Sequence, residues 1–171
     1  MKSRVTPAQT IGPFFHGALC RAGGERLAAA GSAGALEIGG RVLDGAGAPV
    51  DDALLELWQT DGRESAFGRA ATDGQGEYRF VARKLAAAPL ADGRRQAPHI
   101  DVSLFARGLL HRLVTRIYFP DEPEANARDP LLASIPDADV RARLIARPEA
   151  SGRLRFDVVL QGERETPFLD V

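Results

Sequence analysis

The sequence predicts an all-β fold: an antiparallel β-sandwich with one short helix and an extended N-terminal arm. Its 18 glycines and 11 prolines fall between short apolar stretches, a pattern typical of strands joined by turns. Only one stretch of the 171 residues has the character of a helix. Several short strands with a single helix favour two packed antiparallel sheets.

The chain divides into two parts of different composition. Its length fits one folded domain, and we expect this domain at 35–171, where the strand patterns lie. Residues 1–34 are expected to form an N-terminal arm and linker, because the Ala- and Gly-rich stretch 23–34 has no regular period.

Three strands are predicted in the first half of the domain, at 36–43, 53–59 and 77–82, and glycine-rich turns separate them. The strand at 53–59 is apolar on both faces, so we expect burial on both sides or packing against another subunit. Its last residues, Trp58 and Gln59, are expected in the core and at the strand end.

The clearest alternation of apolar and polar residues runs over 99–107 and predicts a half-buried strand. Similar patterns predict a strand at 113–119 and a late strand at 154–160. The stretch 86–97 is expected to be a loop.

The one predicted helix covers 136–147. Pro136 suits the first helical turn, and the acidic residues that follow it suit the positive end of the helix dipole. Arg143 and Arg147 suit the opposite end, and Pro148 is expected to stop the helix.

Charge and cysteine content exclude several classes of protein. Lys and Arg number 22 against 23 Asp and Glu, a net charge of −1 without a basic block, which argues against a nucleic-acid-binding protein. The single Cys20 cannot form an internal disulfide. No apolar run is long enough to span a membrane and no secretory leader is apparent, so we expect a cytoplasmic protein.

Several motifs resemble those of the intradiol ring-cleavage dioxygenases. The stretches GRVLDGAGAPV, LELWQ and GRAATDGQGEYRF, at 40–50, 55–59 and 68–80, carry the general likeness. Four more resemble the subunit without iron of the two-subunit members: TPAQTIGPFF, APHIDVSLFARG, TRIYF and QGERETPF, beginning at residues 6, 97, 115 and 161.

The resemblance implies a partner and a reaction. In the two-subunit members a homologous catalytic β subunit holds a ferric iron through two tyrosines and two histidines. The complex of α–β units opens protocatechuate, bound at the subunit interface, between its two hydroxyl-bearing carbons with dioxygen, giving 3-carboxy-cis,cis-muconate. This chain would correspond to the α subunit, which shapes the substrate pocket and the assembly.

Most positions that hold iron ligands in the family carry other residues in this chain. Where the family pattern has His-x-His, this chain has His99 and Asp101. The only tyrosines, Tyr78 and Tyr118, lie inside predicted strands and are expected to pack in the core or an interface. At most one of four iron ligands remains, so we expect neither a catalytic residue nor a metal site in this chain.

The histidines have other expected roles. His99 is expected to be satisfied by a local hydrogen bond, and His16 and His111 to be surface or hydrogen-bonded structural residues. An alternative left open is that His99 and Asp101 begin a His–carboxylate metal site of an independent metalloenzyme.

Four substrate-binding residues are implied by the resemblance: Thr10, Gly12, Pro13 and Arg107. Gly12 would let the backbone approach a ring closely and Pro13 would fix the chain direction. The Arg107 guanidinium would suit the substrate carboxylate. For Thr10, Gly12 and Pro13 the alternative is an N-terminal arm that only holds two subunits together. For Arg107 the alternative is a surface or interface salt bridge.

Two further interpretations concern Arg116 and the fold itself. Arg116 is expected to form an interface ion pair rather than to bind substrate.

Transthyretin-like modules use a similar strand–turn–strand sequence, so a stand-alone binding module without catalysis is the alternative function. Such a module would not need residues 6–15.

Overall fold

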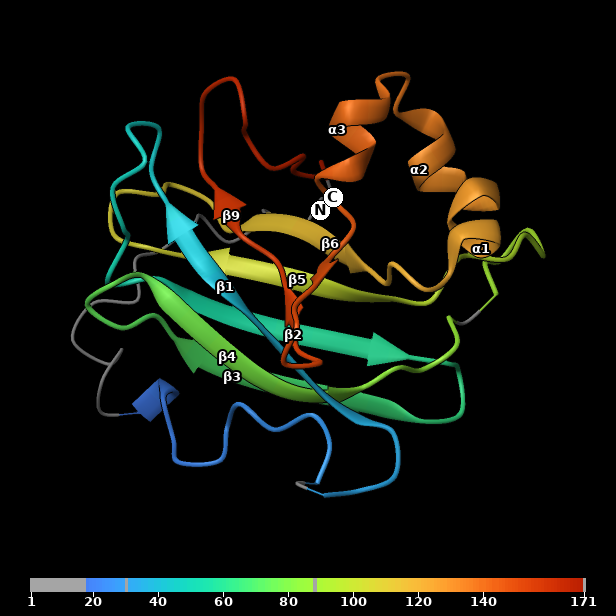
Figure 1. Ribbon diagram of the computed structural model, residues 1–171, viewed down its shortest axis with the longest axis horizontal. Coiled ribbons are helices and arrows are strands. Elements are labelled where there is room, and N and C mark those ends of the chain that lie inside the picture. The colour runs from blue at the N-terminus through green and yellow to red at the C-terminus, as the bar shows by residue number, and fades with distance from the viewer. Residues whose placement is uncertain (1–17, 30, 88, 171) are drawn as a thin grey trace, which may run out of the picture.

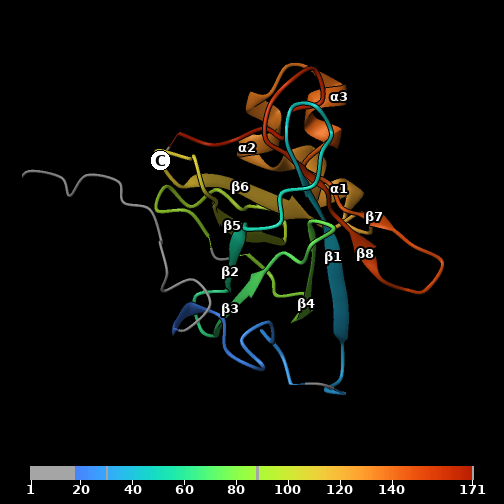
Figure 2. The same cartoon turned by 90° about the vertical axis from the view of Figure 1, so that its left-hand side faces the viewer.

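The computed structural model describes residues 18–29, 31–87 and 89–170 (Figure 1). Two β-sheets stack face to face, and three short helices lie together at one end of the sandwich. Residues 18–29 run along the opposite end, beside β3 and β4 (Figure 2). Among the described residues, no helix is long and apolar enough to cross a membrane. The sandwich predicted from the sequence is confirmed.

The first sheet is antiparallel throughout and has the strand order β3-β2-β5-β6. Its members are β2 (Leu54–Thr60), β3 (Ser65–Ala71), β5 (His99–Phe105) and β6 (Leu113–Tyr118). The strand β3 has no counterpart among the predicted strands, because its SAFGRAA sequence lacks a clear apolar alternation.

The second sheet has the order β4-β1-β8-β7, with β9 also paired to β1. Its antiparallel centre joins β1 to β4, whereas β8 and β9 run parallel to β1. The bounds are β1 (Ala35–Leu43), β4 (Glu77–Arg83), β7 (Arg147–Pro148), β8 (Leu154–Arg155) and β9 (Val158–Val159).

The predicted late strand is therefore broken into two pieces. Between β8 and β9 the chain presses against Gly40 of β1, where an added Cβ would lie 1.8 Å from the carbonyl oxygen of Phe156. The Arg41 amide donates to the Asp157 carboxylate at 2.9 Å instead of to a strand carbonyl. This side-chain hydrogen bond replaces one ladder position, so the strand is interrupted there.

The core lies between the two sheets and follows the predicted alternation. On β5 the residues Ile100, Val102 and Leu104 are at most 1% exposed. They pack with apolar residues of both sheets, including Ile38, Leu55, Leu57, Phe80, Ile117, Phe156 and Val158.

Trp58 was expected in the core, and this prediction is wrong. Leu55 and Leu57 take the inner face of β2, so the period of two turns Trp58 outward, where it is 43% exposed. Its partner across the strand pair, Phe67, is 47% exposed. Of the outward residues of β2, only Leu54 is buried, so burial on both faces is limited to one end of the strand.

The single predicted helix at 136–147 is also corrected. Three short helices form instead: α1 (Pro123–Arg128), α2 (Pro130–Ser134) and α3 (Ala138–Ala142). After α3 the chain pairs with the end of β6, because the Tyr118 amide donates to the Leu144 carbonyl at 2.8 Å and the Ala146 amide to the Tyr118 carbonyl at 2.9 Å. Those backbone groups are unavailable to a helix, and Arg147 enters β7.

Candidate functional site

A cluster of polar side chains surrounds His99 and Asp101, the two positions that the resemblance aligns with the family's His-x-His. We call it the His99 cluster: His99 and Asp101 of β5, Arg116 and Tyr118 of β6, and Asp129, the N-cap of α2. In the strand register His99 lies opposite Tyr118, and Asp101 opposite Arg116. Alternation puts all four strand residues on the face turned away from the core.

The His99 side chain is fixed by contacts with nearby residues of the same chain. Its Nδ1 lies 2.8 Å from the Ala97 carbonyl oxygen, which can only accept, so Nδ1 carries the proton. Its Nε2 lies 3.6 Å from Asp101 Oδ1, and the side chain is 9% exposed. Burial, and then the charge of Arg116, lower the pKa of His99, so the imidazole is neutral at pH 7. The local hydrogen bond expected for His99 is confirmed.

Arg116 places a cation in the middle of the cluster. Its Nε donates to Asp101 Oδ1 at 2.9 Å, and its side chain is 17% exposed. The amide oxygen of Gln96 accepts from both terminal nitrogens, at 2.7 and 3.2 Å, in the amide orientation that satisfies both partners. The ion pair expected for Arg116 therefore forms within this chain.

Asp129 closes the cluster from the helix side. The residue is fully buried, and its carboxylate accepts from the Tyr118 hydroxyl at 3.0 Å and from the Ala97 amide at 2.9 Å. It also accepts from the amides of Leu131 and Leu132 at the start of α2. Burial raises the pKa of Tyr118, so its phenol stays protonated and donates to Asp129.

These residues do not fit a ferric iron held by two phenolates and two imidazoles. The Tyr118 phenol is engaged by Asp129, and the carboxylate at the second histidine position is engaged by a guanidinium. In the parts of the chain that the structure describes, no three His, Cys, Asp or Glu side chains gather in a way that could hold a metal ion. The alternative metal site at His99 and Asp101 thus gains no third ligand.

Both tyrosines pack as the sequence predicts. Tyr118 is fully buried among Ala97, Leu132 and Leu144. Tyr78 is 4% exposed in the main core, and its hydroxyl donates to the Phe156 carbonyl.

His111 is exposed, as expected for a surface residue.

Arg107 lies far from the His99 cluster, just beyond the opposite end of β5. Its side chain is 83% exposed, and its Nε lies 3.2 Å from Asp52 Oδ2. In the single chain Arg107 thus forms a surface salt bridge. The other implied substrate residues, Thr10, Gly12 and Pro13, lie outside the described residues, as does His16.

Sequence reasoning missed Asp129 as a member of the cluster and Gln96 as a hydrogen-bond partner of Arg116. The pairing of Asp101 with Arg116 follows from the two predicted strands once their register is known. Asp129 offered one local signal, a position directly before Pro130, which is typical of a helix N-cap. Nothing local indicates that its carboxylate reaches Tyr118 and Ala97.

Comparison with known proteins agrees with the resemblance. A family model described as "Dioxygenase" matches residues 16–162. The protocatechuate 3,4-dioxygenase alpha chain of Pseudomonas putida is 40% identical, over 96% of each chain. The beta chain of the same enzyme from Burkholderia cepacia is 34% identical, over 96% of this chain and 79% of its own length.

A solved structure extends the agreement to the fold. The dioxygenase domain of a dioxygenase–carbohydrate-binding protein fusion from Streptomyces sp. SirexAA-E superposes with a TM-score of 0.60 at 26% identity. The match covers 91% of this chain and 97% of that domain. With the family match over most of the sequence, these likenesses mean that the chain belongs to the intradiol dioxygenase family.

Proposed function

We propose that this chain is the α subunit, without iron, of a protocatechuate 3,4-dioxygenase. With a homologous β subunit it would open protocatechuate between its hydroxyl-bearing carbons with dioxygen, giving 3-carboxy-cis,cis-muconate. The observation that carries the proposal is the Arg116 guanidinium bound to Asp101 where the family's second imidazole would lie. The full-length likeness to an alpha chain supports the same assignment.

In this proposal the ferric iron belongs to the β subunit. A positive guanidinium inside the His99 cluster repels a metal cation, and the carboxylates of Asp101 and Asp129 already accept hydrogen bonds. The cluster instead stabilises the fold, since it joins β5, β6 and α2 through buried hydrogen bonds.

The contribution of this chain to the reaction would be binding and orientation of the substrate. Arg107 would turn its guanidinium from Asp52 to the carboxylate of protocatechuate, bound at the subunit interface. An exposed ion pair contributes only about 0–1 kcal/mol, so Arg107 loses little free energy when it leaves Asp52 for the substrate carboxylate. Thr10, Gly12 and Pro13, in the arm that we assign to 1–34, would line the same pocket.

The β subunit would cover the outer face of the β3-β2-β5-β6 sheet. Trp58 and Phe67 lie side by side in the strand register on this face, and both are nearly half exposed. Aromatic side chains are enriched at protein interfaces because they bury a large area at a low cost in side-chain entropy. We also propose a cytoplasmic location, in keeping with the lone Cys20.

Co-expression tests the proposal directly. The full chain is produced with and without a homologous partner that carries the two tyrosines and two histidines. Iron content, the burgundy colour of ferric tyrosinate, and conversion of protocatechuate are then measured. We expect iron, colour and activity only in the co-purified complex. Stoichiometric iron in the isolated chain would overturn the assignment, and failure to co-purify would favour the stand-alone binding module.

A further inference from the structure

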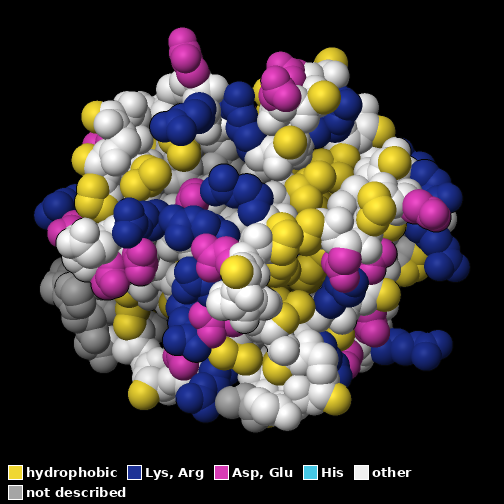
Figure 3. Space-filling model, in the orientation of Figure 1, with side chains coloured by type: hydrophobic (Ala, Val, Ile, Leu, Met, Phe, Trp, Pro, Cys, Tyr) yellow, Lys and Arg dark blue, Asp and Glu magenta, His cyan; other side chains and the backbone are white. Residues whose placement is uncertain are grey.

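A pocket with a volume of about 330 Å³ opens on the face of the molecule that carries β9. It lies between α3, the β7–β8 ribbon and the loop that follows β9. Lys and Arg side chains gather over this part of the surface, beside the hollow (Figure 3). None of the lining residues belongs to the His99 cluster, and Arg107 is not among them.

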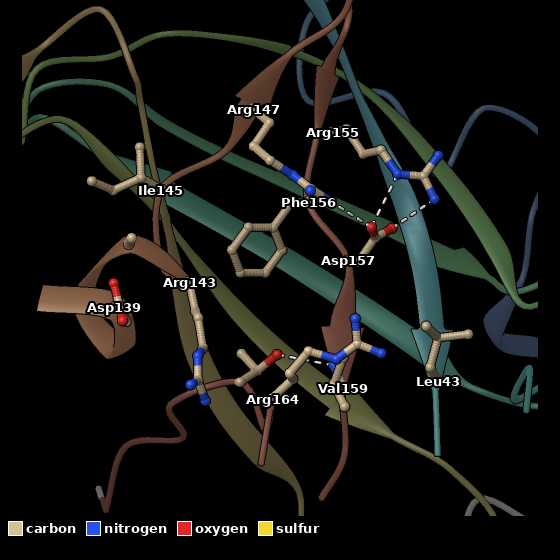
Figure 4. A pocket seen from close by; sticks show the side chains of 12 residues that line it. Leu43, Asp139, Arg143, Ile145, Arg147, Arg155, Phe156, Asp157, Val159 and Arg164 are labelled. Carbon is tan, nitrogen blue, oxygen red and sulfur yellow. Dashed lines mark hydrogen bonds and ion pairs between the residues drawn. The ribbon is translucent and has the colours of Figure 1, made fainter. Parts of the chain in front are cut away.

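The inner part of the pocket is apolar. The Phe156 ring points into the pocket beside Ile145, and Leu43 and Val159 complete the apolar lining (Figure 4). Phe156 itself is 2% exposed and packs in the main core, so its position is fixed by both sheets. The accessible part of this apolar wall is therefore formed by Leu43, Ile145 and Val159, which are partly exposed, and the Phe156 ring supports it rigidly from the core.

The rim of the pocket is positively charged. Four arginines face two aspartates, which leaves a formal charge of +2. Arg147 and Arg155 both bind Asp157, at 2.9 Å, and thereby neutralise it and orient its carboxylate. Arg147 and Arg155 with Asp157 keep a formal charge of +1, and Arg143 and Arg164 with Asp139 carry the other +1.

Arg143 and Arg164 lie on the side of the pocket opposite Arg147 and Arg155 (Figure 4). Arg143 donates one hydrogen bond, to the Glu165 carbonyl oxygen at 3.1 Å. Within 18–29, 31–87 and 89–170, neither arginine has a carboxylate at salt-bridge distance. Two guanidinium groups thus line a concave site that already holds an apolar wall.

We propose that this pocket binds a small organic anion. Its carboxylate would bind Arg143 and Arg164, and its apolar body would lie against Leu43, Ile145 and Val159. A guanidinium fork matches a carboxylate in geometry as well as in charge. The volume is at the lower end of the range for ligand pockets and suits a molecule with a single ring. This proposal goes beyond the function proposed above, because it concerns residues that have no part in it.

The competing occupant is an acidic side chain of a partner subunit. The shape favours the small anion, since a pocket with an apolar floor and a charged rim encloses both ends of a ring acid. An interface ion pair requires only exposed charges on a flat surface.

Titration calorimetry on the assembled complex, with benzoate as the probe, tests the proposal. Benzoate can also occupy the substrate pocket, so the informative quantity is the difference between variants. The pocket variants are Arg164→Gln and the double variant Arg143→Gln/Arg164→Gln. The control is Arg26→Gln/Arg63→Gln, which removes two exposed arginines that do not line the pocket. Benzamide serves as the neutral analogue of the probe.

We expect wild-type complex and control to bind one benzoate more per chain than the double variant. Arg164→Gln should weaken that extra site about tenfold or more, as expected for loss of a charge-assisted hydrogen bond, and benzamide should not occupy it. Identical titrations of wild type and double variant would overturn the proposal. So would sulfate binding as tightly as benzoate, which would leave the apolar wall without a role. Dissociation of the double-variant complex in size-exclusion chromatography, with benzoate binding unchanged, would instead assign the arginines to a partner's carboxylates.

Discussion

At the scale of single residues, the most informative position is Arg116. Its guanidinium fixes the Asp101 carboxylate, and its charge adds to burial in lowering the pKa of His99. Its positive charge balances the negative charge of Asp101, but unlike a metal ion a guanidinium cannot coordinate and exchange ligands. The cluster therefore has a structural role, and the chain's proposed contribution to substrate binding falls to exposed residues such as Arg107.

Replacing Arg107 with alanine in the co-expressed complex tests the substrate role. We expect kcat/KM for protocatechuate to fall about tenfold or more, the value of a charge-assisted hydrogen bond, while catechol, which lacks the carboxylate, is little affected. Steady-state kinetics on both substrates measure the effect, with Arg63→Ala as the control. Equal losses on the two substrates would contradict a carboxylate contact.

The neutral state of His99 predicts a pH dependence of stability. Its pKa is lower in the folded chain than in the unfolded chain, so the unfolded state binds the extra proton first. Between the folded pKa and about 6.5, the usual value for histidine, stability should therefore rise with pH. Above that window the effect should be constant.

Urea denaturation at several pH values, on wild type and His99→Gln, isolates this contribution. We expect the stability difference between the two proteins to increase from pH 5 to pH 7 and then to level off. A difference that does not vary with pH would contradict the neutral, buried imidazole.

At the scale of elements, Asp129 connects a helix to a sheet. Its carboxylate caps α2 and also satisfies the Tyr118 hydroxyl and the Ala97 amide. Asp137 caps α3 in the same manner, but at the surface. The two caps have the same local geometry and differ in burial, so they form a matched pair.

We expect Asp129→Ala to lower the free energy of unfolding by about 3–5 kcal/mol, because several buried donors lose their acceptor at once. Asp137→Ala should cost only about 1 kcal/mol, the usual value for an N-cap. Urea denaturation with linear extrapolation measures both. Equal losses would mean that the buried network adds nothing to simple capping.

Gly40 makes a second connection between elements, since β1 passes the Phe156 carbonyl at a distance that only glycine allows. Gly40→Ala should force β1 away from the segment between β8 and β9 and lower stability by about 3 kcal/mol or more. At Gly74 an added Cβ meets nothing within 4 Å, so Gly74→Ala should change stability by about 0.5 kcal/mol or less. A tolerated Gly40→Ala, seen as an unchanged denaturation midpoint, would show that this contact can relax.

At the scale of the whole molecule, two faces of the sandwich differ in character. The outer face of the β3-β2-β5-β6 sheet exposes Trp58 and Phe67 beside ion pairs such as Arg69 with Glu56. The opposite sheet carries pairs such as Arg79 with Glu37, and among the described residues it exposes no aromatic side chain. Exposed aromatic side chains favour burial against a partner protein, whereas exposed charged side chains are well hydrated in water.

Trp58→Ser should accordingly weaken assembly with the β subunit by about 30-fold or more, the effect of losing an interface hot spot of roughly 2 kcal/mol. The stability of the isolated chain should change little, because Trp58 is half exposed. Arg79→Ser, on the other sheet, is the control. The measurement is the dissociation constant from size-exclusion or light-scattering dilution series, and wild-type assembly of Trp58→Ser would rule out this face as the interface.

The sequence by itself determined the sandwich and the inward faces of β1, β4, β5 and β6. These properties follow from local periodicity and from residue identity, both of which can be read without coordinates. They also carried the resemblance to the intradiol dioxygenases that the family match bears out.

Only the tertiary structure decided where the helices end, where the last strand breaks, and which groups gather around His99 and Asp101. The helix after Asp137 stops because β6 takes the backbone groups of 144–146, and the late strand breaks where it meets Gly40. The guanidinium of Arg116 and the carboxylate of Asp129 reach the same cluster from different elements. Each of these outcomes depends on a partner distant in sequence, and local pattern carries no information about such a partner.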